Sequence, residues 1–557
     1  MASSGNFAVF NHLKYKASSY TASNIDAAGL QLGSTTGNAA QLNVGFKLGD
    51  GKFYYEVYGN TVPSSLHFGV CIGNADLNNV TAGKAIIGYR DSGNKLVSTA
   101  PQTNSTQSSY GASFTGGDIM GCAVDFTNGT IEFYKNNASQ GQFSWSSAND
   151  GETYYPYVYQ NTGIATINTG QDSTFCGNET AQGNTDENGF GDFYYTPPSG
   201  FLAMCSANMP TSSDIDPGGD DGADENPTKQ FNVVTYTGNG STQSITGLGF
   251  QPDMVWIKSR SSSEDPSIYD STRGVTKRLK TSTTGAPSTV SNGFTAFDSD
   301  GFSLGSATEN NGSSQTYVAW CWRAGGGTTS SNSNGASTTT VQANTKAGFS
   351  IVEFPNYTPN STFGHGLNSA PEFIIAVLLS GSQRAIYHTG LSSSSYLLYL
   401  NQTASEATST IFNSTAPTSS VFSLGSSFAG SGTGVAFCWH GVSGFSKFGR
   451  YIGNGNTDGP FIFTGFRPRM LFLRRIDGSG SYLVSDSARR PNNDGTHREL
   501  YWNSNSSEAT GADSHDGVDY HSNGFKLKGS NAGCNGNGNE YIYGAWGDLP
   551  AKYNNGF

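Results

Sequence analysis

The densest group of residues that could do chemistry lies between residues 513 and 521. Two histidines and three carboxylates occur there within nine positions, and a tyrosine lies beside them: Asp513, His515, Asp516, Asp519, Tyr520 and His521. Such a set could bind a divalent metal, chiefly through Asp513, His515, Asp516 and Asp519, or supply an acid and a base for cleaving a sugar bond. The alternative is a solvated loop, which we favour because nothing in the sequence shows that these side chains converge.

Aromatic side chains form a second group of candidates. A flat ring can stack on the apolar face of a sugar, while amides and hydroxyls bind the edge of the sugar. Such a ligand-binding face could be formed by Trp145, Tyr154, Tyr155, Tyr157 and Tyr159. In a chain with 28 tyrosines, the alternative is that these rings fill the interior and the edges of β-sheets. The sequence favours this second interpretation for any single ring.

Motifs that would indicate an enzyme are missing from the sequence. It contains no phosphate-binding loop, no H-E-x-x-H pair and no G-x-S-x-G segment. The seven cysteines lie far apart, without the C-x-x-C spacing of a zinc or redox site, so we expect small buried side chains in a reducing cytosol. The sequence therefore predicts a protein that is not an enzyme and that needs no cofactor.

Composition narrows the fold class. Only 35% of residues are hydrophobic and 13% are charged, whereas 12% are aromatic and 73 are glycine. Aromatics at this level supply several small cores, and the many Gly, Ser and Asn residues suit turns between short strands. The sequence predicts an all-β protein of tandem β-sandwich domains, because 557 residues exceed what one core usually organises.

Charge and hydropathy also limit the partners. The net charge is −12, and no long run of Lys and Arg occurs, so nucleic acid is an unexpected partner. The N-terminal residues lack a basic stretch followed by an apolar one, and no segment of about 18 uncharged apolar residues exists. We therefore expect neither secretion by a signal peptide nor membrane insertion.

The first 210 residues read as alternating strands. Residues 52–58 place Phe53, Tyr55 and Val57 on one face, which is the pattern of a half-buried strand. Residues 118–125 and 131–136 are apolar-alternating runs joined by a turn that contains Asn128 and Gly129, which indicates a hairpin. The stretch from GKFYYEV through GDIMGCAVDFTNGTIEFYKNN to YYPYVY resembles a SPRY module in the version found in phage structural proteins. The resemblance implies a concanavalin-like β-sandwich that binds through its loops.

Beyond residue 230 the chain repeats itself three times. Each repeat begins with a Phe-led strand and then places a proline at the entry to an apolar strand, at Pro252, Pro371 and Pro468. Each closes on a nearly continuous apolar strand that ends at Trp322, Trp439 or Trp546. We expect these closing strands to be core, because a strand buried on both faces has such a pattern.

A polar position also recurs in each repeat, at Asp270, His388 and Asp486. Alternation between Asp and His at one repeat position is more typical of a strand end than of a catalytic residue. A period of about a hundred residues predicts independent sandwiches rather than a solenoid.

The predicted domain boundaries follow from these landmarks. They are a SPRY-like sandwich over 1–210, an acidic linker over 211–229, repeat one over 230–325, a Gly/Ser/Thr linker over 326–346, repeat two over 347–444 and repeat three over 445–557. In the acidic linker, five aspartates could bind calcium, but their spacing does not match a calcium loop. A solvated hinge is the preferred interpretation there.

The repeats add to the resemblance. Segments such as GFQPDMVWIKSR and YVAWCWRAGG are similar to tandem C-terminal repeats of marine and cyanobacterial phage structural proteins. Repeat two departs from the pattern, since Ser369-Ala370 replaces Gly-Phe and residues 376–379 lack charges. The resemblance implies a virion structural protein made in the host cytoplasm, either a tail fibre or adhesin or, alternatively, a capsid decoration or head-fibre protein. A polysaccharide-degrading enzyme is the second alternative.

The expected partners follow from the same resemblance. They are other virion proteins, further copies of the chain in a homo-oligomer, and a host surface glycan or protein.

Overall fold

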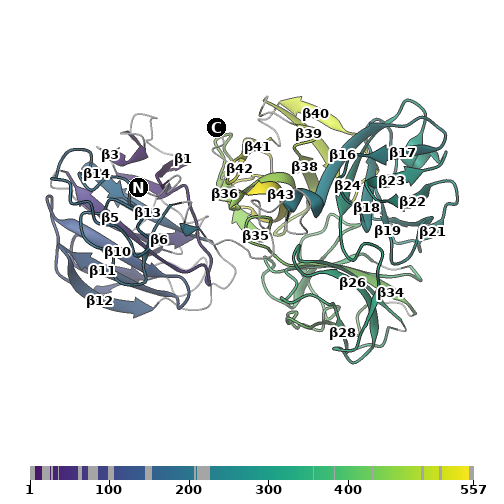
Figure 1. Cartoon of the computed structure of the whole chain (residues 1–557), viewed down its shortest axis with the longest axis horizontal. Helices are drawn as coiled ribbons and strands as arrows, with labels where there is room; N and C mark the ends of the chain where they lie inside the picture. The colour runs from purple at the N-terminus through teal and green to yellow at the C-terminus, as the bar shows by residue number, and fades with distance from the viewer. Residues whose placement is uncertain are drawn as a thin grey trace. The chain divides into compact units, whose positions relative to one another are not determined.

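The computed structural model is all-β and confirms the predicted fold class (Figure 1). It describes residues 7–15, 25–26, 29–34, 37–60, 65–72, 86–97, 106–144, 153–205, 208–209, 226–355, 357–381, 383–428, 432–490, 493, 495–512 and 517–550. The chain forms two compact units, Met1–Pro210 and Thr211–Phe557, except that Pro460–Phe463 groups with the first. No helix in the described part is long and apolar enough to cross a membrane.

The first unit is a sandwich of two antiparallel sheets. One sheet has the order β1-β4-β13-β6-β7-β8-β9, formed by Phe10–Tyr15, Asn38–Leu42, Tyr154–Gln160, His67–Ile72, Ile86–Arg90, Asn94–Val97 and Thr106–Ser109. The other has the order β12-β11-β10-β5-β14-β3-β2, formed by Ala138–Ser144, Thr130–Lys135, Ile119–Asp125, Lys52–Gly59, Gly163–Asn168, Gln31–Ser34 and Ile25–Asp26, with β15 (Leu202–Ala203) beside β5. The predicted hairpin is confirmed as β10 and β11, and Gly129 has a φ of +63° in its turn.

Strand β5 shows how the sequence pattern was incomplete. Phe53, Tyr55 and Val57 point into the main core, as predicted. The opposite face, predicted to be exposed, is also buried, because Tyr54 packs in a second cluster with Phe193 and other residues of the segment after β14. This segment therefore forms a further layer over the second sheet.

The second unit contains one large and one small sheet from each repeat. The large sheets are β16-β24-β18-β19-β20-β21 (Phe231–Thr237, Thr316–Trp322, Met254–Ser259, Ser267–Asp270, Lys277–Lys280, Ser288–Thr289), β25-β26-β27-β34-β29-β30-β31-β32 (Ser330–Asn332, Thr339–Asn344, Phe349–Phe354, Gly434–Trp439, Phe373–Leu378, Ala385–His388, Tyr396–Tyr399, Ala407–Thr408) and β35-β43-β37-β38-β39-β40 (Ser446–Ile452, Glu540–Pro550, Phe466–Arg475, Leu483–Asp486, Thr496–Tyr501, Ala509–Ala512).

The small sheets complete each repeat. They are β17-β23-β22 (Gln243–Thr246, Gly301–Leu304, Phe294–Asp298), the pair β28 and β33 (Ser361–Gly364, Val421–Leu424) and the pair β41 and β42 (Val518–His521, Gly524–Leu527). Strand β36 (Phe461–Phe463) falls in the segment that groups with the first unit. In the described part of the unit, the short helices are η5 (Pro227–Lys229) and α1 (Thr308–Asn311).

The repeats share one core, so the prediction of three independent sandwiches is wrong. A single hydrophobic cluster contains residues of all three repeats. At its centre lie Trp322, Trp439 and Trp546, the last residues of the three apolar closing runs, with ring centroids 5.5–6.1 Å apart and edge-to-face geometry. In repeats one and two the strand alternation turns one set of side chains toward this centre and the other toward a local core, such as the Val255 and Cys321 cluster of repeat one. The closing strands are therefore core, as predicted.

The predicted Gly/Ser/Thr linker over 326–346 is also wrong, because it contains β25 and β26 of the repeat-two sheet. The buried carboxylate of Asp253 accepts hydrogen bonds from the backbone N–H groups of Ala324, Gly326 and Gly327 at 2.7–2.8 Å. Gln342 of β26 donates to the Ser271 hydroxyl of repeat one at 2.9 Å. The segment thus joins two repeats as part of the structure. Of the acidic linker, residues 211–225 lie outside the described residues.

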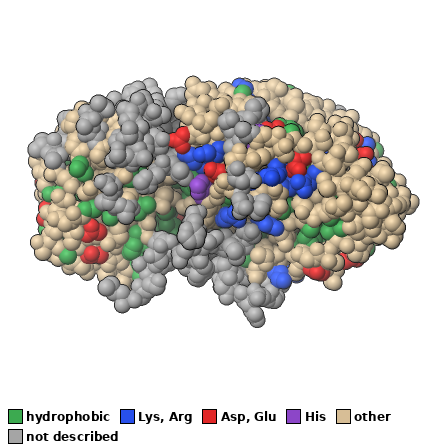
Figure 2. Space-filling view, turned by 90° about the horizontal axis from the view of Figure 1, so that it is seen from above, with side chains coloured by type: hydrophobic (Ala, Val, Ile, Leu, Met, Phe, Trp, Pro, Cys, Tyr) green, Lys and Arg blue, Asp and Glu red, His purple; other side chains and the backbone are tan. Residues whose placement is uncertain are grey.

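The surface fits the low charged fraction of the sequence. Where Figure 2 draws the described residues of one face, uncharged side chains and backbone predominate, with acidic and basic side chains in small groups among them. Six of the seven cysteines are buried, and Cys176 is half-buried. The sequence predicted these cysteine positions to be interior.

Candidate functional site

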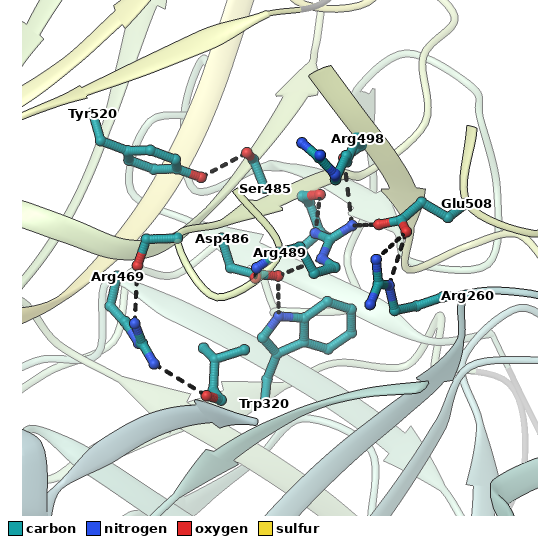
Figure 3. A network of polar contacts seen from close by, with 12 residues as sticks. Arg260, Trp320, Arg469, Ser485, Asp486, Arg489, Arg498, Glu508 and Tyr520 are labelled. Atoms are coloured by element: carbon teal, nitrogen blue, oxygen red, sulfur yellow. Dashed lines mark hydrogen bonds and ion pairs between the residues drawn. The ribbon is translucent and has the colours of Figure 1, made fainter. Parts of the chain in front are cut away.

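A buried network of charges lies between repeats one and three (Figure 3). Asp486 accepts a hydrogen bond from the Arg489 Nε at 2.7 Å and from the Trp320 indole N–H at 3.0 Å. Arg489 reaches on to Glu508 at 3.0 Å, and Glu508 also pairs with Arg260 of repeat one at 2.7 Å. Asp486 and Arg489 have side chains that are at most 1% exposed.

The chemistry of this network is structural. Both carboxylates are held by guanidinium groups, and burial keeps solvent from the central pair. An acid or base catalyst needs a proton that it can exchange with a substrate. This pair instead links one repeat to the next, since Trp320 and Arg260 come from repeat one and the other three residues come from repeat three.

The recurring polar position confirms the strand-end interpretation. Asp270, His388 and Asp486 are the last residues of β19, β30 and β38. Each accepts a backbone hydrogen bond from the turn that follows, from the N–H of Arg273, Gly390 and Arg489 at 2.8–2.9 Å. These side chains therefore close turns. His388 and Asp486 also bind another repeat, since the His388 Nε2 lies 3.1 Å from the Tyr543 carbonyl.

Buried cationic side chains also connect the repeats across the contacts between them, and we call each such contact a seam. The Lys258 Nζ donates to the carbonyl of Asn505 in repeat three at 3.2 Å. Arg474, at the same repeat position, donates to the carbonyl of Ala404 in repeat two. Repeat two has Val377 there, buried in the shared core, and uses Arg384 instead, which donates to the carbonyl of Gly285 in repeat one at 2.7 Å. Each repeat thus binds backbone carbonyls of one neighbour, which closes the three into a ring.

The lowered pKa of Lys258 provides a test of the seam between repeats one and three. Burial lowers the pKa of Lys258 to about 8 from an ordinary value of 10.5, although Glu264, Asp265 and Glu508 oppose the shift. Between pH 8 and 10.5 the unfolded chain binds a proton at Lys258 that the folded chain does not, so the contribution of Lys258 to the free energy of unfolding rises with pH in this window. We expect Lys258→Met to lose this rise and to leave stability at pH 7 within about 1 kcal/mol of the wild type or higher. Denaturant unfolding at several pH values measures both quantities, and an unchanged pH slope in the variant would contradict the assignment.

The predicted metal site is only partly visible. Asp513, His515 and Asp516 lie outside the described residues. Asp519 is on β41, where it pairs with Arg490 at 3.1 Å and approaches Lys528 at 3.9 Å. Among the described residues, no group of three or more His, Cys, Asp or Glu side chains could hold a metal ion. Asp519 is therefore held by cations.

The predicted aromatic face is divided by the fold. Trp145 lies outside the described residues. Tyr154, Tyr155 and Tyr157 are at most 3% exposed, because β13 is an inner strand that pairs with β4 and β6. Only Tyr159 is half-buried among the four described rings. The tyrosines therefore do not form one exposed stacking face, and Tyr159 alone keeps a ring at the surface.

The first unit also buries a carboxylate that the sequence analysis missed. Glu56 is fully buried on β5, where it accepts from the backbone N–H groups of Tyr194 and Tyr195 at 3.0 and 2.8 Å and from the Asn168 amide at 3.0 Å. It holds the covering segment against the sheet. An acidic residue at an apparently exposed strand position gave no signal in the sequence, because the layer above it is made by residues more than a hundred positions later.

Glu56 predicts a pH dependence of the first unit. Burial raises the pKa of Glu56 from 4.5 to about 7 against the hydrogen bonds that lower it. Because the folded chain then binds this proton more tightly than the unfolded chain, the contribution of Glu56 to stability is greatest below pH 4.5 and falls as the pH rises to about 7. We expect the difference in unfolding free energy between wild type and Glu56→Gln to change across this window. A difference that is constant with pH would show that Glu56 does not titrate there.

Comparisons with known proteins match both units. Residues 52–172 match the SPRY domain, and residues 226–550 match a domain of unknown function, DUF7483. The SPRY domain of human HERC1 is 20% identical over 28% of this chain and 96% of that chain, with a TM-score of 0.23. The TRIM65 PSpry domain is 14% identical over 29% of this chain and 91% of that chain, with a TM-score of 0.22. No curated protein matches.

The family match agrees with the shared core, since one domain model spans all three repeats. It covers more than half of the chain. The chain consists of an N-terminal SPRY domain followed by a DUF7483 region, and it belongs to the DUF7483 family.

Proposed function

We propose that this protein is a structural component of a bacteriophage particle, a tail fibre or adhesin that contacts the host cell surface. In this proposal the SPRY domain provides recognition, and the DUF7483 unit is a rigid support. The resemblance of both parts of the sequence to phage structural proteins motivates the assignment.

The construction of the DUF7483 unit is the observation that carries the proposal. Several of its buried charged side chains lie at the seams between repeats, where Asp486, Arg489, Lys258, Arg384 and Arg474 bind neighbouring strands and carbonyls. A shared aromatic core joins the same three repeats. Groups that could do chemistry are thus used for rigidity, which suits a load-bearing particle protein better than an enzyme.

The proposal includes a homo-oligomer, other virion proteins as partners and a glycan or protein of the host surface as the receptor. Repetition of the chain on one particle multiplies weak contacts, so a modest affinity in each SPRY domain suffices for attachment. No cofactor is required for such binding.

Labelling of intact particles tests the proposal. An antibody against residues 231–557 is applied to particles and viewed by electron microscopy. Label at the distal tail supports the adhesin, and label across the head supports the alternative of a decoration or head-fibre protein. Absence of label from particles overturns the virion assignment, and breakdown of host polysaccharide by the purified full chain overturns the non-enzymatic one.

A further inference from the structure

A row of polar side chains crosses the first sheet of the SPRY domain. Tyr159 on β13, His67 on β6 and Arg90 on β7 lie opposite one another in the strand register, so they share one face. The face is the one turned away from the sandwich interior, because the adjacent Phe68 packs edge-on against Phe133 of the second sheet at 5.2 Å. The imidazole of His67 lies 5.0 Å from the ring of Tyr159.

Tyr157 lies on the same face as this row, and its hydroxyl lies over a glycine of β7. It lies two positions before Tyr159 on β13, and its hydroxyl is placed over Gly88 of β7, where a Cβ would clash with it. Gly88 is two residues from Arg90 on the same strand. The Tyr157 hydroxyl thus reaches across β6 toward the strand that carries the guanidinium.

Among the described residues, no hydrogen-bond partner is present for four buried atoms of this group. They are both ring nitrogens of His67, the hydroxyl of Tyr157 and the Nε of Arg90. His67 and Tyr157 are fully buried, whereas Tyr159 and Arg90 are half-buried at the rim. Buried polar atoms normally find a partner, so a cluster of them marks a place where a ligand or ordered water completes the bonding.

The charge of the cluster indicates which class of ligand it can bind. Arg90 donates to the Gln107 amide oxygen at 2.8 Å, and among the described residues no carboxylate lies within ion-pair distance of it. Burial, aided by the charge of Arg90, lowers the pKa of His67 to about 3, so the imidazole is neutral and offers one donor and one acceptor. A neutral His, a hydroxyl and a guanidinium with no carboxylate partner among the described residues together suit a group that carries a negative charge beside hydroxyls.

We propose that His67, Arg90, Tyr157 and Tyr159 form a binding site for the carboxylate of an acidic sugar. Arg90 pairs with the carboxylate, His67 and Tyr157 bond to its oxygens or to adjacent hydroxyls, and the half-buried ring of Tyr159 lies against the sugar. The inference rests on the proposed function, for which it names the receptor class as an anionic host glycan.

Titration of the full chain with D-glucuronate tests the site by calorimetry. We expect saturable binding that weakens by at least about tenfold in Arg90→Met, since hydrogen bonds to charged groups contribute this much. The matched control is Lys95→Met on the neighbouring strand β8, whose ammonium lies 4.6 Å from the centre of the Phe143 ring. It removes the same charge from the same sheet and leaves glucuronate affinity unchanged. Arg90→Lys keeps the charge and retains part of the affinity.

Two further titrations show which part of glucuronate the site recognises. Glucose tests the sugar without the carboxylate, and inorganic phosphate tests the charge without the sugar. No binding of glucuronate, or equal weakening in Arg90→Met and Lys95→Met, overturns the site and leaves ordered water as the partner of these atoms. Phosphate that binds as tightly as glucuronate overturns the sugar assignment.

A direct readout at His67 accompanies the titration. In full chain labelled at the histidine ring carbons, glucuronate shifts one imidazole resonance, and His67→Gln removes that resonance. A shift in a different histidine places the sugar elsewhere and overturns the site. Particle labelling by antibody does not depend on glucuronate, so failure of the site and failure of the virion proposal are distinguished.

Discussion

Replacing Asp486 with Ala is expected to lower the free energy of unfolding of the DUF7483 unit by about 3–5 kcal/mol, the usual effect of removing one partner from a buried ion pair. The variant leaves the Arg489 guanidinium and the Trp320 indole N–H without the acceptor that they share, at side chains that are at most 1% exposed. Glu508 still pairs with Arg489 but cannot replace the Trp320 contact. Denaturant unfolding of the full chain, followed through the second unit, measures the loss.

The matched control is Asp477→Ala in the same repeat. Asp477 pairs with Arg475 at the same 2.7 Å, but these side chains are 33% and 22% exposed. Solvent screening limits such a pair to about 0.2–1 kcal/mol. Equal losses in the two variants would show that the Asp486 network does not close the seam.

A double-mutant cycle with Trp320→Phe assigns the effect to the seam. Phe keeps most of the ring and removes the indole donor. Because Trp320 belongs to repeat one and Asp486 to repeat three, their coupling energy reports contact between repeats. We expect a coupling of about 1 kcal/mol or more, as for residues in one hydrogen-bond network.

The second large effect is expected from Trp439→Ala, which should cost about 3–5 kcal/mol. Trp439 lies 5.9 and 6.1 Å from its counterparts Trp322 and Trp546, and it is buried in the core that all three repeats share. Its removal opens a cavity at the centre of the three repeats, where the three tryptophans pack together. Trp439→Phe is the conservative control and is expected to lose less.

Hydrogen exchange distinguishes a shared core from separate domains. If the three repeats form one cooperative unit, Trp439→Ala lowers protection in peptides of repeats one and three as well as repeat two. Protection lost only within residues 347–444 would restore the model of independent sandwiches. Peptides of the SPRY domain serve as the internal reference, since it is a separate compact unit.

Local patterns in the sequence were sufficient for the elements. The strands around Phe53 and the hairpin at Gly129 follow from alternation and turn chemistry, and both are confirmed. The positions of Asp270, His388 and Asp486 at strand ends were also predicted correctly. These features depend on neighbours within a few residues, which the sequence shows directly.

The candidate sites were harder to predict from the sequence than the strands were. Tyr154, Tyr155 and Tyr157 gave the pattern of a possible stacking face, but β13 is an inner strand, so their rings are buried. Of the Arg90 cluster, Tyr157 and Tyr159 were among the predicted ligand-binding candidates, but His67 and Arg90 were not, since these residues come from β6, β7 and β13 and meet only through the strand register. Which residues share a face across a sheet depends on pairing between distant segments.

The sequence by itself determined the all-β class, the SPRY module and the threefold repeat, because strand alternation, turn residues and repeated landmarks are local or periodic. Only the tertiary structure decided that the repeats form one unit. From the sequence, the Gly-rich segment 324–327 looks like a flexible linker, but in the structure its backbone N–H groups donate to the Asp253 carboxylate. Likewise, the three closing tryptophans suggest three separate cores, but in the structure they pack together in one core. Both outcomes depend on the burial of groups that are about 70 to 220 residues apart in the chain, and composition carries no information on such contacts.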